Sequence, residues 1–132
     1  MALATWVVAG PACDDAASPT ETCIASQADT CSPLYSPTWS EVHERTIARK
    51  CAQGGSACHG AAPGQGGLVL VDRDQAYDAL LESYVIPNDP SCSELIIRMH
   101  STVPGVAMPP GSPLSASERC SVEQWIAAGA TR

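Results

Sequence analysis

Two thiols and an imidazole lie close together in the segment Cys51-Ala-Gln-Gly-Gly-Ser-Ala-Cys58-His59. Two thiols can bond covalently to the two vinyl groups of haem, and an imidazole can bind the iron from one side. The segment Met108-Pro109-Pro110 offers a thioether for the opposite side. Because neither proline can donate a backbone hydrogen bond, Met108 is expected on a stiff, extended loop. Imidazole and thioether together favour ferrous iron and raise the potential for electron transfer.

Over roughly residues 36 to 129, these features make the chain resemble a small monohaem c-type cytochrome. In that family a helix leads into the haem-attachment motif, a Met-Pro loop follows, and a C-terminal helix closes the core. The same order is found here, ending in Trp125-Ile126-Ala-Ala-Gly129. The family motif has two residues between its cysteines, whereas six separate Cys51 from Cys58. The flexible run Gln53-Gly54-Gly55-Ser56 can loop out and still bring the two sulfurs together.

The resemblance implies an all-α, cytochrome c-like fold with about four helices and long loops wrapped around one haem. It implies one covalent haem c attached at Cys51 and Cys58, with His59 and Met108 as the axial iron ligands. The implied function is electron transfer to or from a redox partner protein rather than catalysis. The chain then serves as a free carrier or as the electron-inlet domain of a larger redox enzyme.

Each of these residues also has an alternative interpretation. Cys51 and Cys58 can form a disulfide in a haem-free helical binding or structural module. A zinc site is disfavoured because the chain has no second paired Cys or His motif. Met108 can be a core filler, although a proline- and glycine-rich loop is a poor place for core. The reserve ligands are Met99, which fits an apolar helix face, and His100, which fits a helix end. His43 is expected to be partly buried rather than a ligand.

The chain has 132 residues, a net charge of −7 and a single lysine, Lys50. This balance argues against nucleic acid, which requires a basic footprint, and against charge-driven docking on anionic lipid. An acidic carrier is expected to prefer a basic partner surface. The chain has no phenylalanine. A helical domain with so few aromatic residues buries a thin core, and a central haem would supply the missing apolar bulk.

The N-terminal quarter differs in composition from the rest of the chain. Residues 1–12 are an apolar remnant of a signal peptide or an apolar tail, too short to span a bilayer. Cys13 follows a small residue and is a candidate for lipidation, which would be the protein's only link to a membrane. Residues 13–35 are predicted to be a low-complexity tether, and residues 36–132 the haem domain. Together these features predict a secreted, periplasmic or cell-envelope protein.

Periodicity and capping signals predict four helices within the haem domain. The first runs from about Pro37 to Cys51, and the second follows Asp72 and continues to about Tyr84. The third begins at a capping box of Ser91 with Glu94 and ends near His100. The last begins at a second capping box, Ser115 with Glu118, and carries Trp125 on its inward face. Tyr77, Tyr84, Trp125 and the leucines are expected to line the haem crevice.

Seven cysteines leave one thiol outside any set of disulfides. If haem takes Cys51 and Cys58 and lipid takes Cys13, four cysteines remain. We expect these to pair as Cys23 with Cys31 and Cys92 with Cys120, because Cys120 points away from the Trp125 face of its helix and is then peripheral. If haem uses Cys58 alone, Cys51 joins one of three disulfides. Both assignments leave an even number of cysteines for disulfides, so the cysteine count does not choose between them.

Overall fold

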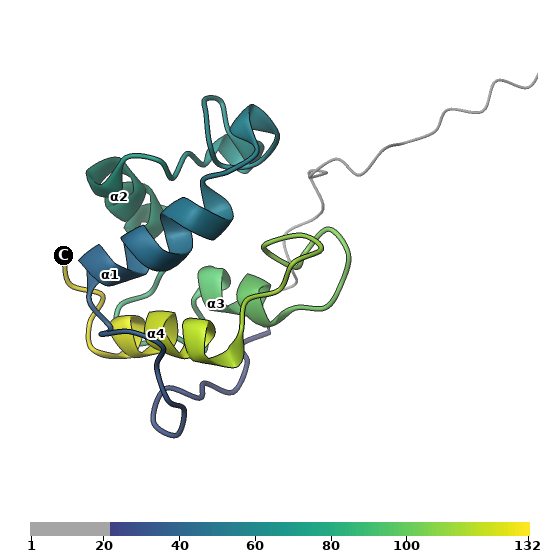
Figure 1. Ribbon diagram of the computed structural model, residues 1–132. Helices are drawn as coiled ribbons and strands as arrows, with labels where there is room; N and C mark the ends of the chain where they lie inside the picture. Colours follow the sequence, from purple (N-terminus) through teal and green to yellow (C-terminus); the bar gives the residue numbers. More distant parts are fainter. Residues whose placement is uncertain (1–21) are drawn as a thin grey trace, which may run out of the picture.

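The computed structural model describes residues 22–132, and within them the fold is all-helical and contains no strand (Figure 1). This confirms the predicted fold class and the number of main helices. The elements in chain order are α1 (Trp39–Val42), the π-helix η1 (His43–Cys51), the short 3-10 turns η2 (Gly55–Ala57) and η3 (Gln65–Gly67), α2 (Arg73–Ser83), α3 (Glu94–His100) and α4 (Ala116–Ala127). No helix among the described residues is long and apolar enough to cross a membrane.

Two of the predicted helix starts are confirmed by their hydrogen bonds. The Asp72 carboxylate caps α2 by accepting from the backbone of Asp74 and Gln75 at 3.0 and 2.9 Å. At α4 the capping box is complete: the Glu118 amide donates to the Ser115 hydroxyl at 3.1 Å, and the Ser115 amide donates to the Glu118 carboxylate at 3.0 Å. Side-chain acceptors satisfy helix-terminal N–H groups that have no partner within the helix.

The other two starts differ from the prediction. Ser93, not Ser91, precedes α3, and its hydroxyl does not cap the helix. It donates to the Asp89 carbonyl at 2.7 Å and accepts from the Ile86 amide at 2.9 Å, so it stabilises the preceding turn. The first helix begins after Thr38 rather than at Pro37. It continues without a break into η1, where the Ala52 amide donates to the Ile47 carbonyl five residues earlier at 2.9 Å. Such wide turns are rare and occur often at functional sites.

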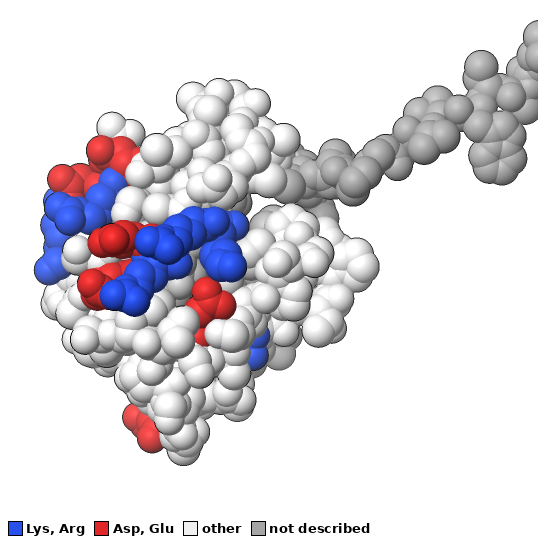
Figure 2. All heavy atoms as spheres, viewed as in Figure 1, with Lys and Arg blue, Asp and Glu red and all other residues white. Residues whose placement is uncertain are grey.

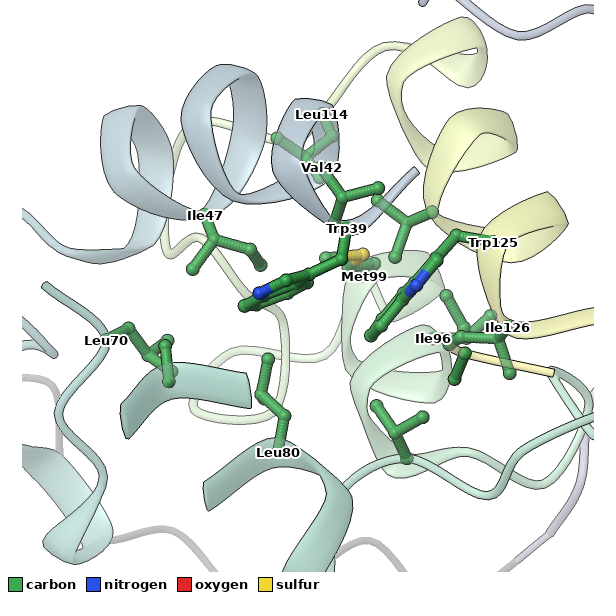
Figure 3. Close-up of a cluster of buried hydrophobic side chains, with 14 of the residues drawn as sticks. Trp39, Val42, Ile47, Leu70, Leu80, Ile96, Met99, Leu114, Trp125 and Ile126 are labelled. Carbon is green, nitrogen blue, oxygen red and sulfur yellow. The ribbon is translucent and has the colours of Figure 1, made fainter. Parts of the chain in front are cut away.

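The core is built around the indole rings of Trp39 and Trp125, whose centroids are 5.1 Å apart (Figure 3). Tyr77 meets Trp39 edge-on at 5.4 Å. Figure 3 shows aliphatic side chains from all four main helices and from η1 packed around this pair. Burial of rings and aliphatic chains together is the main favourable term in folding. The first helical stretch contributes a buried stripe from Trp39 to Ile47 to this core.

Residues 22–35 pack against α4, in contrast to the tether that their composition predicts (Figure 1). The Leu34 amide donates to the Ser121 hydroxyl at 2.9 Å, and the Gln27 amide donates to the Glu123 carboxylate at 2.7 Å. Tyr35 is buried, and its hydroxyl lies 2.5 Å from the hydroxyl of Thr46 on η1. The segment therefore belongs to the folded domain. The apolar tail and the lipid proposed for Cys13 fall on residues outside the described part of the chain.

The predicted disulfide pairs are wrong. Cys23 is bonded to Cys92, and Cys31 is bonded to Cys120. Cys120 does point away from the Trp125 face, but it is only 1% exposed because residues 22–35 cover that side of α4. The partners are 69 and 89 residues apart in sequence. In the chain-entropy description, closing such long loops stabilises the fold by about 4.5 kcal/mol each.

Candidate functional site

The four predicted site residues, Cys51, Cys58, His59 and Met108, all line one cavity of about 600 Å³. Its walls come from the end of η1, the loop between η1 and α2, the α2 and α3 helices, and the loop that carries Met108. The volume lies in the range of sites that enclose a small-molecule cofactor. Most of the wall is apolar, with side chains from both sides of the cavity: Leu68, Leu70, Leu80, Tyr84, Leu95 and Met99.

His59 is held in one orientation by the backbone. Its Nδ1 lies 3.0 Å from the carbonyl oxygen of Leu68. Because a carbonyl oxygen can only accept, Nδ1 carries the proton, and Nε2 of the neutral ring keeps its lone pair. A histidine that binds a metal commonly donates its other ring N–H to a carbonyl in this way, which fixes both the tautomer and the ring direction. His59 thus has the arrangement of a metal ligand that binds through Nε2.

The other two histidines use Nε2 for contacts within the fold. His43 is buried, as predicted, and its Nε2 lies 3.1 Å from the carbonyl oxygen of Leu70. The Nε2 of His100 lies 2.6 Å from the carboxylate of Glu123 on α4. Neither ring lines the cavity. His59 is the one histidine of the chain that does so.

Met108 is tied to α3 through its backbone. The Met108 amide donates to the carbonyl of Arg98 at 3.0 Å, close to the C-terminal end of α3. This bond holds the Met-Pro-Pro loop against the helix, with Met108 at the cavity wall. Met99 also lines the cavity, from within α3, and is only 3% exposed. The cavity therefore has two thioethers, one on a loop and one on a helix.

Cys51 is the last residue of η1, and its thiol faces an apolar wall. Burial raises the pKa of Cys51 to about 12, from an ordinary value of 9.0, because the thiolate is poorly solvated there. Neither Cys51 nor Cys58 takes part in the two disulfides. The chain turns back at the end of the intervening segment, since the Cys58 and Gly60 amides both donate to the Gly55 carbonyl, at 3.3 and 2.9 Å. The widened spacing thus still brings both cysteines to the same cavity.

The backbone at Gly54 approaches Cys58 closely. A Cβ at this position would lie 2.9 Å from the Cys58 sulfur, and the Gly54 φ angle is +73°. Both features favour glycine, because a side chain would be strained by the backbone angle and crowded by the thiol. The glycine run between the cysteines therefore helps to place Cys58 at the cavity.

The structure also shows which predictions about the wall were too broad and which residues were missed. Tyr84 lines the cavity as predicted, whereas Tyr77 and Trp125 belong to the core beside it. Three basic side chains at the wall were not predicted, namely Arg49, Lys50 and Arg98. Arg49 and Lys50 directly precede Cys51, and this adjacency was the one sequence signal that placed them near the site.

Residues 56–112 match the family model described as Planctomycete cytochrome C. They form a cytochrome c domain. The matched segment contains Cys58, His59 and Met108, and it begins after Cys51. Domains of this family carry covalent haem c and are typically electron carriers rather than enzymes. No curated protein and no solved structure gives a significant match to the chain.

The residues of this cytochrome c domain fit a haem c by the chemistry of their donors. The hydrogen bond at Nδ1 of His59 leaves the lone pair of its Nε2 available for iron. Thioethers line the same cavity, and the thiols of Cys51 and Cys58 can bond to the vinyl groups. The surrounding wall is mainly aliphatic, as a low-dielectric site for a flat macrocycle requires.

Proposed function

We propose that this protein is an electron carrier with one covalently bound haem c, ligated by His59 and Met108 and attached through Cys51 and Cys58. The observation that supports this best is that one cavity contains all four residues, with the His59 tautomer selected by the Leu68 carbonyl. A match to a cytochrome c family model over residues 56–112, which contain Cys58, His59 and Met108, supports the cofactor independently. When bound, the haem supplies an iron that alternates between the ferric and ferrous states.

The chain's own residues would control that iron in three ways. The Leu68 carbonyl orients the His59 ring, and the bond from the Met108 amide to the Arg98 carbonyl positions the thioether. Both ligands are neutral, so they favour the ferrous state and a high potential. Leu70, Leu80 and Leu95 make the cavity wall apolar and would keep water from the haem. A dry site raises the reduction potential further, because the ferric form has the larger charge and loses more solvation there than the ferrous form. With His59 and Met108 both bound to the iron, no coordination position would remain for a substrate.

The disulfides support a compartment outside the cytoplasm. Two long-range disulfides are typical of proteins that fold in an oxidising environment, such as the bacterial periplasm. We therefore place the protein in the periplasm or cell envelope, with lipid on Cys13 as a possible anchor and a redox protein as its partner.

The test is to export the protein in a host with haem-attachment machinery and to measure its mass and its reduced spectrum. We expect the mass of one covalent haem and the spectrum of a low-spin c-type cytochrome. The α-band of the pyridine derivative reports how many vinyl groups are bonded, and Cys51→Ser should shift it toward a single thioether. An apoprotein mass without haem absorption would refute the proposal and favour a haem-free helical module.

The axial ligand needs its own comparison. Met108→Ala should keep haem attached while removing the methionine–iron charge-transfer band and lowering the potential. The matched variant Met99→Leu removes the other thioether of the cavity and should keep that band. Loss of the band in Met99→Leu with retention in Met108→Ala would transfer the role to Met99.

A further inference from the structure

We propose that the redox partner docks at the rim of the cavity and presents carboxylates to Arg49 and Lys50. This inference rests on the proposed function, because it assigns the surface at which that function is exercised. It reverses the expectation from net charge, which predicts a basic partner surface for an acidic carrier.

The charges that line the cavity are of one sign. Arg49, Lys50 and Arg98 belong to its lining, whereas no Asp or Glu among the described residues does. The whole chain has 14 acidic and 7 basic residues. Three of the seven basic side chains are thus gathered at the site, and the carboxylate of Glu94 adjoins the lining only through its ion pair with Arg98. This distribution is opposite to the overall charge balance.

The three basic side chains differ in their accessibility. Arg49 and Lys50 stand at the C-terminal end of η1 and are exposed, so a protein can approach them from solvent. Arg98 is half-buried, and its Nε donates to Glu94 at 2.7 Å, which offsets much of its charge. Figure 2 shows basic side chains, with acidic ones beside them, over the helical stretch that continues from α1 in Figure 1. We therefore assign the contact with the partner's carboxylates to Arg49 and Lys50, and not to the half-buried Arg98.

Screening makes this local charge decisive for a docked partner. At physiological salt, charges more than about 8 Å apart are largely screened. A partner in contact with the rim therefore interacts with Arg49 and Lys50 more strongly than with carboxylates on remote faces. Electrostatic complementarity at such a patch raises association rates and orients the encounter. Because Lys50 is followed by Cys51, an encounter at this rim brings the partner within a few residues of the proposed haem attachment.

The first test measures how salt affects electron transfer between the ferrous holoprotein and hexacyanoferrate(III), a small anion. One electron passes to each hexacyanoferrate(III), which becomes hexacyanoferrate(II) as the haem iron becomes ferric. If the basic rim governs the encounter, the second-order rate falls as salt is raised, despite the net charge of −7. A rate that rises with salt overturns the inference, because it shows that the overall negative charge governs the encounter.

Charge reversal locates the effect. Lys50→Glu should slow the reaction several-fold at low salt, and Arg49→Glu/Lys50→Glu should slow it by roughly tenfold. The matched control is Arg73→Glu, which makes the same change in net charge at an exposed position that does not line the cavity. Equal slowing by Lys50→Glu and Arg73→Glu would refute a local docking site.

A binding readout removes the dependence on electron transfer. Hexacyanochromate(III) is a paramagnetic anion that ferrous haem does not reduce, and it broadens the NMR signals of nearby amides. We expect broadening at Arg49 and Lys50 that is lost in Arg49→Glu/Lys50→Glu. Broadening centred on another surface, or none, overturns the inference and indicates that the haem's own propionates neutralise the rim. Failure to load haem would instead refute the proposed function, so the two outcomes are distinguishable.

Discussion

The two sides of α3 are stabilised in different ways. On one side, residues 22–35 are joined by Cys23–Cys92 to the segment before α3 and by Cys31–Cys120 to α4, and a buried polar cluster lies beside these links. The Glu123 carboxylate, 1% exposed, accepts from the Ser26 hydroxyl at 3.0 Å and the Gln27 amide at 2.7 Å, and it meets His100 at 2.6 Å. Three protein groups thus bond to this buried carboxylate, as burial of a carboxylate requires.

On the other side, the cavity is enclosed mostly by irregular chain. The loop between η1 and α2 has only short 3-10 turns, and the loop with Met108 has no regular element. The apolar wall between them surrounds an open volume of about 600 Å³ rather than another layer of side chains. The two sides of α3 therefore depend on different interactions. Covalent links and satisfied polar groups stabilise the side away from the site, while on the cavity side the proposed haem would complete the core.

The largest effect is expected on the cavity side, from His59→Ala. It should remove the axial nitrogen and with it most haem incorporation, because ligation and attachment are coupled. The measurement is the ratio of haem absorbance to protein in exported material. His100→Gln alters an imidazole outside the cavity and should keep haem at nearly the normal level. Normal yields of low-spin holoprotein from His59→Ala would contradict the assignment.

The next largest effect is expected on the stability of the disulfide-linked side of α3. Replacing Cys31 and Cys120 together by serine should lower the free energy of unfolding by about 2–5 kcal/mol, since a long loop is no longer closed in the unfolded chain. The haem spectrum of the folded variant should be unchanged, because neither cysteine lines the cavity. Denaturant titration gives the first quantity and the reduced spectrum the second. A variant with normal stability but an altered haem spectrum would break the comparison.

A smaller effect is expected from Cys51 in protein produced without haem. The thiol loses its proton near pH 9 when the chain is unfolded and near pH 12 when folded. The unfolded state alone therefore releases a proton between these values. The contribution to stability is complete below pH 9 and is lost as the pH rises, by roughly 1.4 kcal/mol per unit. Unfolding at pH 9 and 10 measures it, and Cys51→Ala should remove this part of the slope.

The smallest effect compares two adjacent glycines of the cavity side. Gly54→Ala and Gly55→Ala both place a side chain at a positive φ, which costs about 1 kcal/mol in each. Only the Gly54 variant also crowds the Cys58 sulfur, since nothing lies within 4 Å of a Cβ at Gly55. Gly54→Ala should therefore have the lower melting temperature and the lower haem yield. Equal values would show that Cys58 moves aside without cost.

Local features of this protein were determined by its sequence alone. The caps of α2 and α4 could be predicted because their partners lie within three residues. The candidate ligands were also recognisable from residue type and spacing, and the structure brings all four to one cavity. Thiols, an imidazole and a thioether have distinctive chemistry wherever the chain places them. The glycine run between Cys51 and Cys58 indicated that a loop could reconcile their unusual separation.

What only the tertiary structure decided depends on contacts between residues far apart in sequence. Composition predicts a tether for residues 22–35, yet those residues pack on α4 because Ser121 and Glu123 supply polar partners nearly a hundred residues away. The same packing buries Cys120 and determines the disulfide partners. The basic lining of the cavity is likewise invisible to the net charge of −7, since η1 and α3 bring Arg49, Lys50 and Arg98 to one cavity only in the folded chain. Helical periodicity gives the direction of a side chain from its own helix, whereas the element that covers it is chosen by the fold as a whole.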